Sequence, residues 1–322
     1  MTMFDDPKLP FSSAPDEPSR HPEHPTEDLA DKIVVGEPEP VPGLPGDPMS
    51  LAGAAAATPP PPSSGLPDDL RISWGWLHFV AFLFFGFVSF LITQIGAGLY
   101  FIAQSHNAHL TQKDLEHMVA SKPIVPIVAN VLLYALIIFF LYLSIPVLKN
   151  LPFWHTFGWR KLVPNGNAPS NPWLYFAGGI GLSLCVAIVS TRIKTPENLS
   201  IEQLFKSRNG AFLLMGMAVL IAPLVEETVF RGYLYPLFAK NWGVAPAVVI
   251  TGVLFGLMHG AQLGWTMGLV AMLITVGIIF TFARARAGTV LASFLLHLGY
   301  NSMIAFSAII STHGFTRMPP HP

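Results

Sequence analysis

The chain has 322 residues, of which 52% are hydrophobic and only 11% are charged. A soluble domain has about 25% charged residues, and a membrane-spanning helix needs ~20 consecutive apolar residues. Several uninterrupted apolar runs reach that length. The composition therefore excludes an ordinary soluble domain and predicts an integral, multi-pass membrane protein. The single cysteine, Cys185, excludes an intrachain disulfide and a Cys-x-x-Cys metal or redox site.

Charge is divided unevenly along the chain. Residues 1–72 hold 13 of the 19 acidic residues and only 4 of the 18 basic residues. This segment is rich in Pro, Ala and Ser and poor in apolar side chains. Because it cannot bury enough surface to offset the entropy of ordering, we expect a disordered tail. The other basic residues are scattered among the connections between apolar runs, which suits lipid headgroups and argues against a nucleic-acid partner.

From residue 73 onward the sequence alternates apolar runs with polar connections. In lipid, every backbone polar group must be satisfied within its own segment, so these runs predict helices. The expected fold class is all-α, a polytopic transmembrane helical bundle. We count about seven spans, at residues 76–104, 123–148, 173–191, 211–238, 244–260, 265–283 and 288–311.

Two adjacent glutamates stand out within these spans. Ionisable side chains inside an apolar span are costly and mark candidate functional sites. Of the acidic residues after residue 72, only Glu226 and Glu227 lie within a span. Arg231 follows Glu227 by one helical turn, at a spacing that permits an ion pair. Glu226 projects about 100° away from Glu227, so it needs a different partner.

Two histidines and an asparagine could supply that partner. His259 ends the run 244–260, and His297 lies in the middle of the run 288–311. Asn301 follows His297 by four residues and projects from the same helix face. Each of these residues alone is more often a hydrogen-bonded packing residue than a catalytic group. Their occurrence together with the two carboxylates and the arginine indicates a shared polar site.

These residues narrow the chemistry of hydrolysis within a membrane. No aspartate occurs after Asp114, which excludes a pair of intramembrane aspartates. A Gly-x-Ser-x-Gly nucleophile loop and a His-Glu-x-x-His zinc motif are both absent from the sequence. What remains is a glutamate base, with or without a metal.

Three short motifs resemble those of a known family. They are EETVFR at residues 226–231, FGLMH at 255–259 and HLGYN at 297–301. Their order and spacing are Glu-Glu-x3-Arg, Phe-x3-His and His-x3-Asn on successive helices. This pattern is similar to the CPBP family of intramembrane peptidases, which includes CAAX prenyl endopeptidases and abortive-infection proteins. The resemblance covers roughly residues 211–305, about a third of the chain.

The resemblance implies an intramembrane endopeptidase that hydrolyses a peptide bond of a membrane-associated protein or peptide. Glu226, helped by His259, would activate a water molecule. His297 and Asn301 would stabilise the oxyanion of the tetrahedral intermediate.

The resemblance also implies how the rest of the membrane part is organised. Glu227 and Arg231 would be a supporting ion pair that holds their helix in register. Residues 73–200 would form N-terminal transmembrane helices, and residues 201–313 would form the catalytic core. The expected location is the bacterial cell (inner) membrane.

The sequence leaves the participation of a metal open. Zinc could be held by Glu226, His259 and His297, because two imidazoles and a carboxylate match a catalytic zinc site with an open position for water. The His-x3-Asn element favours the metal-free version, since asparagine is a poor zinc ligand and a good oxyanion donor.

Two functions from other classes fit part of the pattern. Glu226 and Glu227 could form the relay of a proton- or ion-coupled transporter. The chain could instead be a catalytically silent bacteriocin-immunity or scaffold protein. A relay does not require His-x3-Asn, and intact motifs argue against a loss of catalysis, so we favour the peptidase.

Overall fold

The computed structural model describes residues 67–105, 111, 114, 118–119, 121–166, 168–193 and 207–316. These residues belong to one compact unit, Pro62–Pro322. The secondary-structure elements that they form are all helices, which confirms the predicted all-α class. The predicted tail, 1–72, lies outside the described residues except for its last part. There Asp68–Leu70 form a short 3-10 turn, and Leu70 is buried.

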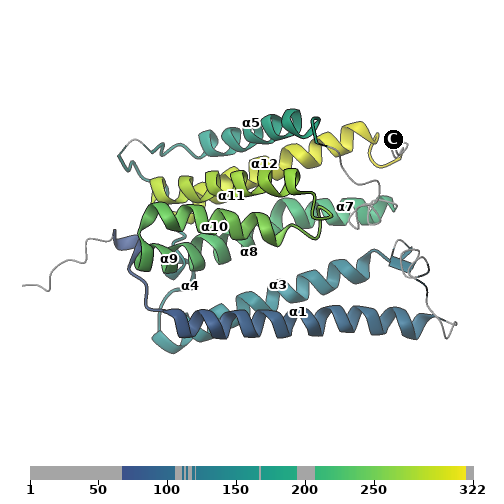
Figure 1. The fold of residues 1–322 in the computed structure, drawn as a ribbon, viewed down its shortest axis with the longest axis horizontal. Coiled ribbons are helices and arrows are strands. Elements are labelled where there is room, and N and C mark those ends of the chain that lie inside the picture. Colours follow the sequence, from purple (N-terminus) through teal and green to yellow (C-terminus); the bar gives the residue numbers. More distant parts are fainter. Residues whose placement is uncertain are drawn as a thin grey trace, which may run out of the picture. The chain divides into compact units, whose positions relative to one another are not determined.

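Figure 1 shows how the helices follow one another along the chain. The α-helices are α1 Trp76–Gln104, α3 Ile124–Tyr142, α4 Phe153–Thr156, α5 Pro172–Ser190, α7 Arg208–Gly216, α8 Ala222–Glu227, α9 Tyr235–Trp242, α10 Val244–Met258, α11 Met267–Ala287 and α12 Val290–Ser311. Three π-helical turns extend or join them. They are Leu143–Val147 after α3, Met217–Ile221 between α7 and α8, and Thr228–Leu234 between α8 and α9.

Six helices of the described residues are long and apolar enough to cross a membrane, by length and composition. Four of them are single α-helices, namely α1, α5, α11 and α12. The others are composite: Ile124–Val147 includes the π turn after α3, and Arg208–Trp242 runs from α7 to α9. The remaining predicted span, 244–260, corresponds to α10, which is apolar but has only 15 residues. At 1.5 Å per residue such a helix is too short to cross a hydrocarbon core of about 30 Å.

Local side-chain chemistry accounts for several helix ends. The side chain of Asn171 accepts a hydrogen bond from the backbone N–H of Trp173 and caps α5. Thr289 caps α12 in the same way through the N–H of Leu291. Between α11 and α12 the chain turns at Gly288, whose φ of +69° suits glycine because a Cβ is disfavoured there.

α1 and α3, and likewise α10 and α11, pack as antiparallel neighbours, whereas α5 and α12 run parallel to each other. In Figure 1, α1 and α3 lie side by side as a hairpin, α5 runs along α12, and α10 packs against α11 and α9. The chain reverses direction between successive spans, with Arg208–Trp242 counted as one span. The C-terminal ends of α1, α5, α10 and α12 therefore point to the same end of the bundle, and α10 stops short of it.

Glycines allow the closest helix contacts. A Cβ on Gly179 of α5 would collide with the backbone carbonyl of Leu296 on α12, and a Cβ on Gly299 would collide with the backbone of Phe176. In membranes, small residues let helix backbones approach closely and gain van der Waals contact. The α5–α12 pair is therefore held at backbone distance along one glycine-lined face.

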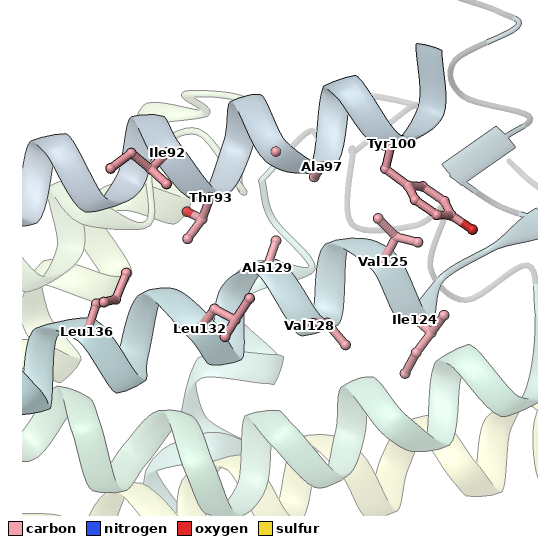
Figure 2. A pocket seen from close by; sticks show the side chains of 11 residues that line it. Ile92, Thr93, Ala97, Tyr100, Ile124, Val125, Val128, Ala129, Leu132 and Leu136 are labelled. Carbon is pink, nitrogen blue, oxygen red and sulfur yellow. The ribbon is translucent and has the colours of Figure 1, made fainter. Parts of the chain in front are cut away.

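A second packing feature is an apolar cavity of about 490 Å³ within the α1–α3 hairpin. Figure 2 shows Ile92, Thr93 and Tyr100 of α1 facing Val125 and Leu132 of α3 across it. Among the described residues, the hydroxyl-bearing side chains in its wall are Thr93 and Tyr100, and no acidic or histidine side chain lines it.

The glycine contact predicts the outcome of a matched pair of substitutions. Gly179→Val places two methyl groups against the α12 backbone and should lower the free energy of unfolding by about 1–3 kcal/mol. Gly181→Val, on the same helix, meets nothing within 4 Å and should leave stability nearly unchanged. Thermal unfolding in detergent micelles measures both changes. Equal melting temperatures for the two variants would contradict the close packing of α5 on α12.

Candidate active site

One interrupted helix carries both glutamates. Within Arg208–Trp242, the π turn Met217–Ile221 ends directly before α8, and the backbone N–H of Ala222 bonds the carbonyl of Met217 five residues earlier. The next residue, Pro223, has no N–H to continue this pattern, so the carbonyl of Ala218 is left without its helical donor. Such π-helical turns occur frequently at functional sites.

Glu226 and Glu227 at the end of α8 have opposite environments. The side chain of Glu226 is 15% exposed and lines a cavity of about 470 Å³. The side chain of Glu227 is fully buried and does not line the cavity. The rotation of about 100° between neighbouring helical residues therefore separates one carboxylate that can meet a ligand from one that meets only protein.

Two side chains, those of Arg231 and His297, hold Glu227 in place. Its Oε1 accepts a hydrogen bond from Arg231 Nη1 at 2.9 Å, one helical turn away. The same oxygen lies 2.9 Å from His297 Nδ1 on α12. Since a carboxylate oxygen accepts and does not donate, Nδ1 of His297 carries the proton. Glu227 thus joins its own helix to α12.

Arg231 has a partner for each of its nitrogens. Besides Glu227, it donates from Nη2 to the carbonyl of Gly277 at 2.8 Å and from Nε to Thr281 Oγ1 at 3.1 Å, both on α11. Its guanidinium carbon lies 4.5 Å from the ring centroid of Phe255 on α10. This fully buried cation therefore ties three helices together, as a planar fork of five donors can.

The two imidazoles approach Glu226 from α10 and α12. His259 Nε2 and His297 Nε2 each lie 3.9 Å from Glu226 Oε2. His259 Nδ1 lies 2.8 Å from the carbonyl of Phe255, which can only accept, so this ring also carries its proton on Nδ1. In their neutral forms both rings turn the Nε2 lone pair toward the same carboxylate oxygen. Separations above 3.5 Å between polar atoms leave room for a bridging water.

Asn301 lines the same cavity and makes one firm contact. Its Nδ2 donates to the carbonyl of Ala218 at 2.7 Å, which is the carbonyl freed by Pro223. One of its two amide hydrogens therefore completes the interrupted helix. The second hydrogen is left for a group in the cavity.

The structure brings the six predicted side chains together from three helical segments. Glu226, His259, His297 and Asn301 all line one cavity, and Glu227 and Arg231 lie buried beside it. Apolar residues from α5, α7, α11 and α12 form most of the remaining wall.

Sequence reasoning missed the polar residue of the cavity that contacts Glu226. Tyr134 on α3 lines the cavity and donates its hydroxyl to Glu226 Oε1 at 3.2 Å. A signal was present, because a tyrosine in the middle of a span departs from the usual position at the membrane interface. Nothing in the spacing of the motifs indicated which helix would face Glu226.

The geometry does not fit a preformed metal centre. Zinc ligands bind at about 2.0–2.2 Å with tetrahedral angles, which brings the ligand atoms closer to one another than the 3.9 Å found around Glu226 Oε2. Across the described residues, no group of three or more His, Cys, Asp or Glu side chains is arranged to hold a metal ion. The chemistry of the site is therefore considered from its protein side chains and water.

Residues 208–303 match the family model of the type II CAAX prenyl endopeptidases, Rce1-like. The resemblance to this peptidase family is confirmed. The Rce1-like segment, residues 208–303, contains all three motifs and begins at the first residue of α7. Together with the six apolar helices, it identifies an integral multi-pass membrane protein.

Two curated bacterial proteins are similar to the chain. UPF0177 protein YbdI of Lactococcus lactis subsp. lactis (strain IL1403) is 29% identical over 136 residues, which are 42% of this chain and 71% of that protein. An Escherichia coli protein named "Uncharacterized 24.3 kDa protein" is 30% identical over 131 residues, which are 39% of this chain. The chain spans only 59% of the length of the second relative. No solved structure matches.

The buried network around Arg231 predicts a large loss of stability on truncation. Arg231→Ala leaves Glu227 charged and buried without its cation, which should cost about 3–5 kcal/mol. Arg286→Ala removes an exposed arginine from α11 and serves as the control. Melting temperatures in detergent compare the two variants. A melting temperature of Arg231→Ala equal to that of the control would show that the pair does not stabilise the fold.

Proposed function

We propose that the protein is an intramembrane endopeptidase that hydrolyses a peptide bond of a membrane-associated protein or peptide. The observation that carries the proposal is the position of Glu226 Oε2, 3.9 Å from both His259 Nε2 and His297 Nε2 in a cavity of about 470 Å³. The family of the Rce1-like segment supports the reaction class, and the bacterial relatives support a location in the bacterial cell membrane.

In this proposal Glu226 is the general base. A water molecule between Glu226 Oε2 and the imidazoles gives up a proton to the carboxylate while its oxygen attacks the peptide carbonyl carbon. A base that reaches the water directly contributes about 10²–10⁴-fold to the rate. His259 presents an Nε2 lone pair to the same water, because its Nδ1 proton is committed to the carbonyl of Phe255. When the C–N bond breaks, the proton on Glu226 passes to the leaving amine.

His297 and Asn301 would stabilise the negative charge that forms on the carbonyl oxygen. The buried carboxylate of Glu227 lies 2.9 Å from His297 Nδ1 and orients the ring so that its Nε2 faces the cavity. With a proton on Nε2 as well as on Nδ1, His297 donates from Nε2 toward the oxyanion. Asn301 donates the amide hydrogen that Ala218 does not use. Donors of this kind, already oriented in a site that excludes bulk water, are effective because they need no reorganisation.

The decisive experiment is cleavage of a membrane-associated peptide by purified protein in proteoliposomes. Glu226→Gln should lower kcat by about 10²–10⁴-fold, because the amide cannot accept the proton. His313→Asn changes an exposed histidine beyond the end of α12 and should keep wild-type activity. Undiminished cleavage by Glu226→Gln would refute the proposal. Ion-coupled uptake without any proteolysis would instead support the transporter.

The same preparation tests the zinc hypothesis. We expect activity to persist after treatment with a strong chelator, since the proposed water activation uses only Glu226 and His259. Loss of activity that is restored by added zinc would instead assign Glu226, His259 and His297 as ligands. Metal content measured before and after chelation provides the control.

Asn301 offers a second, independent prediction. Asn301→Ala removes one oxyanion donor and should lower kcat by about 10²–10³-fold. The KM should stay within about twofold, because the donor acts mainly on the transition state. A variant that loses thermal stability but retains wild-type kcat would limit Asn301 to its bond with Ala218.

A further inference from the structure

The proposed base receives a hydrogen bond from outside the Rce1-like segment. Tyr134 lies on α3, and its hydroxyl donates to Glu226 Oε1 at 3.2 Å. The family match begins at residue 208, so α3 belongs to a part of the chain that the match does not cover. The α1–α3 hairpin therefore supplies a polar group to the cavity as well as an apolar wall.

We propose that Tyr134 is a positioning residue for Glu226. This inference rests on the proposed peptidase function. By occupying Oε1, the phenol holds the carboxylate so that Oε2 faces the two imidazoles and the water between them.

The contacts of Glu226 give this hydroxyl its importance. Among the described residues, Tyr134 is the one partner within hydrogen-bond distance of the Glu226 carboxylate, since the imidazole contacts at 3.9 Å are longer than a hydrogen bond. A glutamate side chain has several rotatable bonds, and a lining that is mostly apolar does little to orient it. Catalytic geometry is sensitive to such freedom, because a misplacement of 1 Å can cost about 10²-fold in rate.

The chain provides a matched control on the same helix interface. Tyr233, on the π turn after α8, places its hydroxyl 2.7 Å from His78 Nδ1 on α1. His78 Nε2 lies 2.8 Å from Ser144 Oγ, at the end of α3. This second phenol therefore links the same hairpin to the same interrupted helix. Tyr233 is not among the described residues that line the cavity, and its hydroxyl pairs with His78 instead of Glu226.

The test compares Tyr134→Phe with Tyr233→Phe in the proteoliposome assay. Tyr134→Phe should lower kcat roughly tenfold with KM within twofold of wild type, since one hydrogen bond to a charged group is lost. Tyr233→Phe should keep kcat within twofold and lower the melting temperature. The proposal is overturned by a wild-type kcat in Tyr134→Phe, by a change confined to KM, or by equal losses of kcat in both variants.

A binding measurement separates positioning from misfolding. The dissociation constant of the peptide is measured for Glu226→Gln and for the double variant Tyr134→Phe/Glu226→Gln. Equal constants show that the fold and the substrate site survive the loss of the hydroxyl, whereas a tenfold weaker constant in the double variant overturns the positioning role. Failure of the peptidase proposal itself has a different signature, because wild type would then cleave no peptide or Glu226→Gln would cleave as fast as wild type.

Discussion

A buried negative charge on Glu227 is the constraint on which the rest of the site depends. A carboxylate with no exposed surface is stable only if its charge is compensated within hydrogen-bond distance. Here Arg231 compensates it from the same helix and His297 from α12, each at 2.9 Å. Arg231 in turn bonds to two positions of α11. The charge therefore fixes the mutual position of three helical segments before any catalytic requirement is considered.

This arrangement explains why the neighbouring residues Glu226 and Glu227 have different surroundings. Once Glu227 is fixed, the helix rotation directs Glu226 about 100° away from it, toward the cavity. His297 connects the two, because its Nδ1 bonds to Glu227 and its Nε2 faces Glu226. The buried carboxylate and the proposed base thus share one imidazole. The buried pair orients a ring that the proposed mechanism uses, in the way that outer hydrogen-bond partners orient catalytic histidines.

Much of this could be predicted from the sequence because it depends on local spacing. Apolar run lengths indicated the helices, and the i, i+4 spacing of Glu227 and Arg231 indicated their ion pair. The bond between Tyr134 and Glu226 joins residues 92 positions apart, and no periodicity within either helix encodes such a pairing. The bond of Asn301 to Ala218 was equally hidden, since it depends on a π turn that shifts the helical hydrogen bonds ahead of Pro223. The run predicted at 244–260 corresponds to α10, which ends two residues earlier, at Met258, because hydropathy does not register where a helix ends inside a bundle.

The short α10 has a physical consequence for the proposed hydrolysis. Its start is level with the start of α1, because Trp242, the last residue of α9, contacts Trp76 with ring centroids 5.1 Å apart. With 15 residues against 29 in α1, α10 ends well before the far end of the bundle. His259 lies at the C-terminal end of α10, and the turn that follows it contributes Gln262 to the cavity wall. Non-helical backbone at membrane depth is tolerated where it is buried in protein or lines a water-filled cavity. Because α10 stops short, His259 lies at a helix end, where its side chain is 21% exposed and lines the cavity beside Gln262.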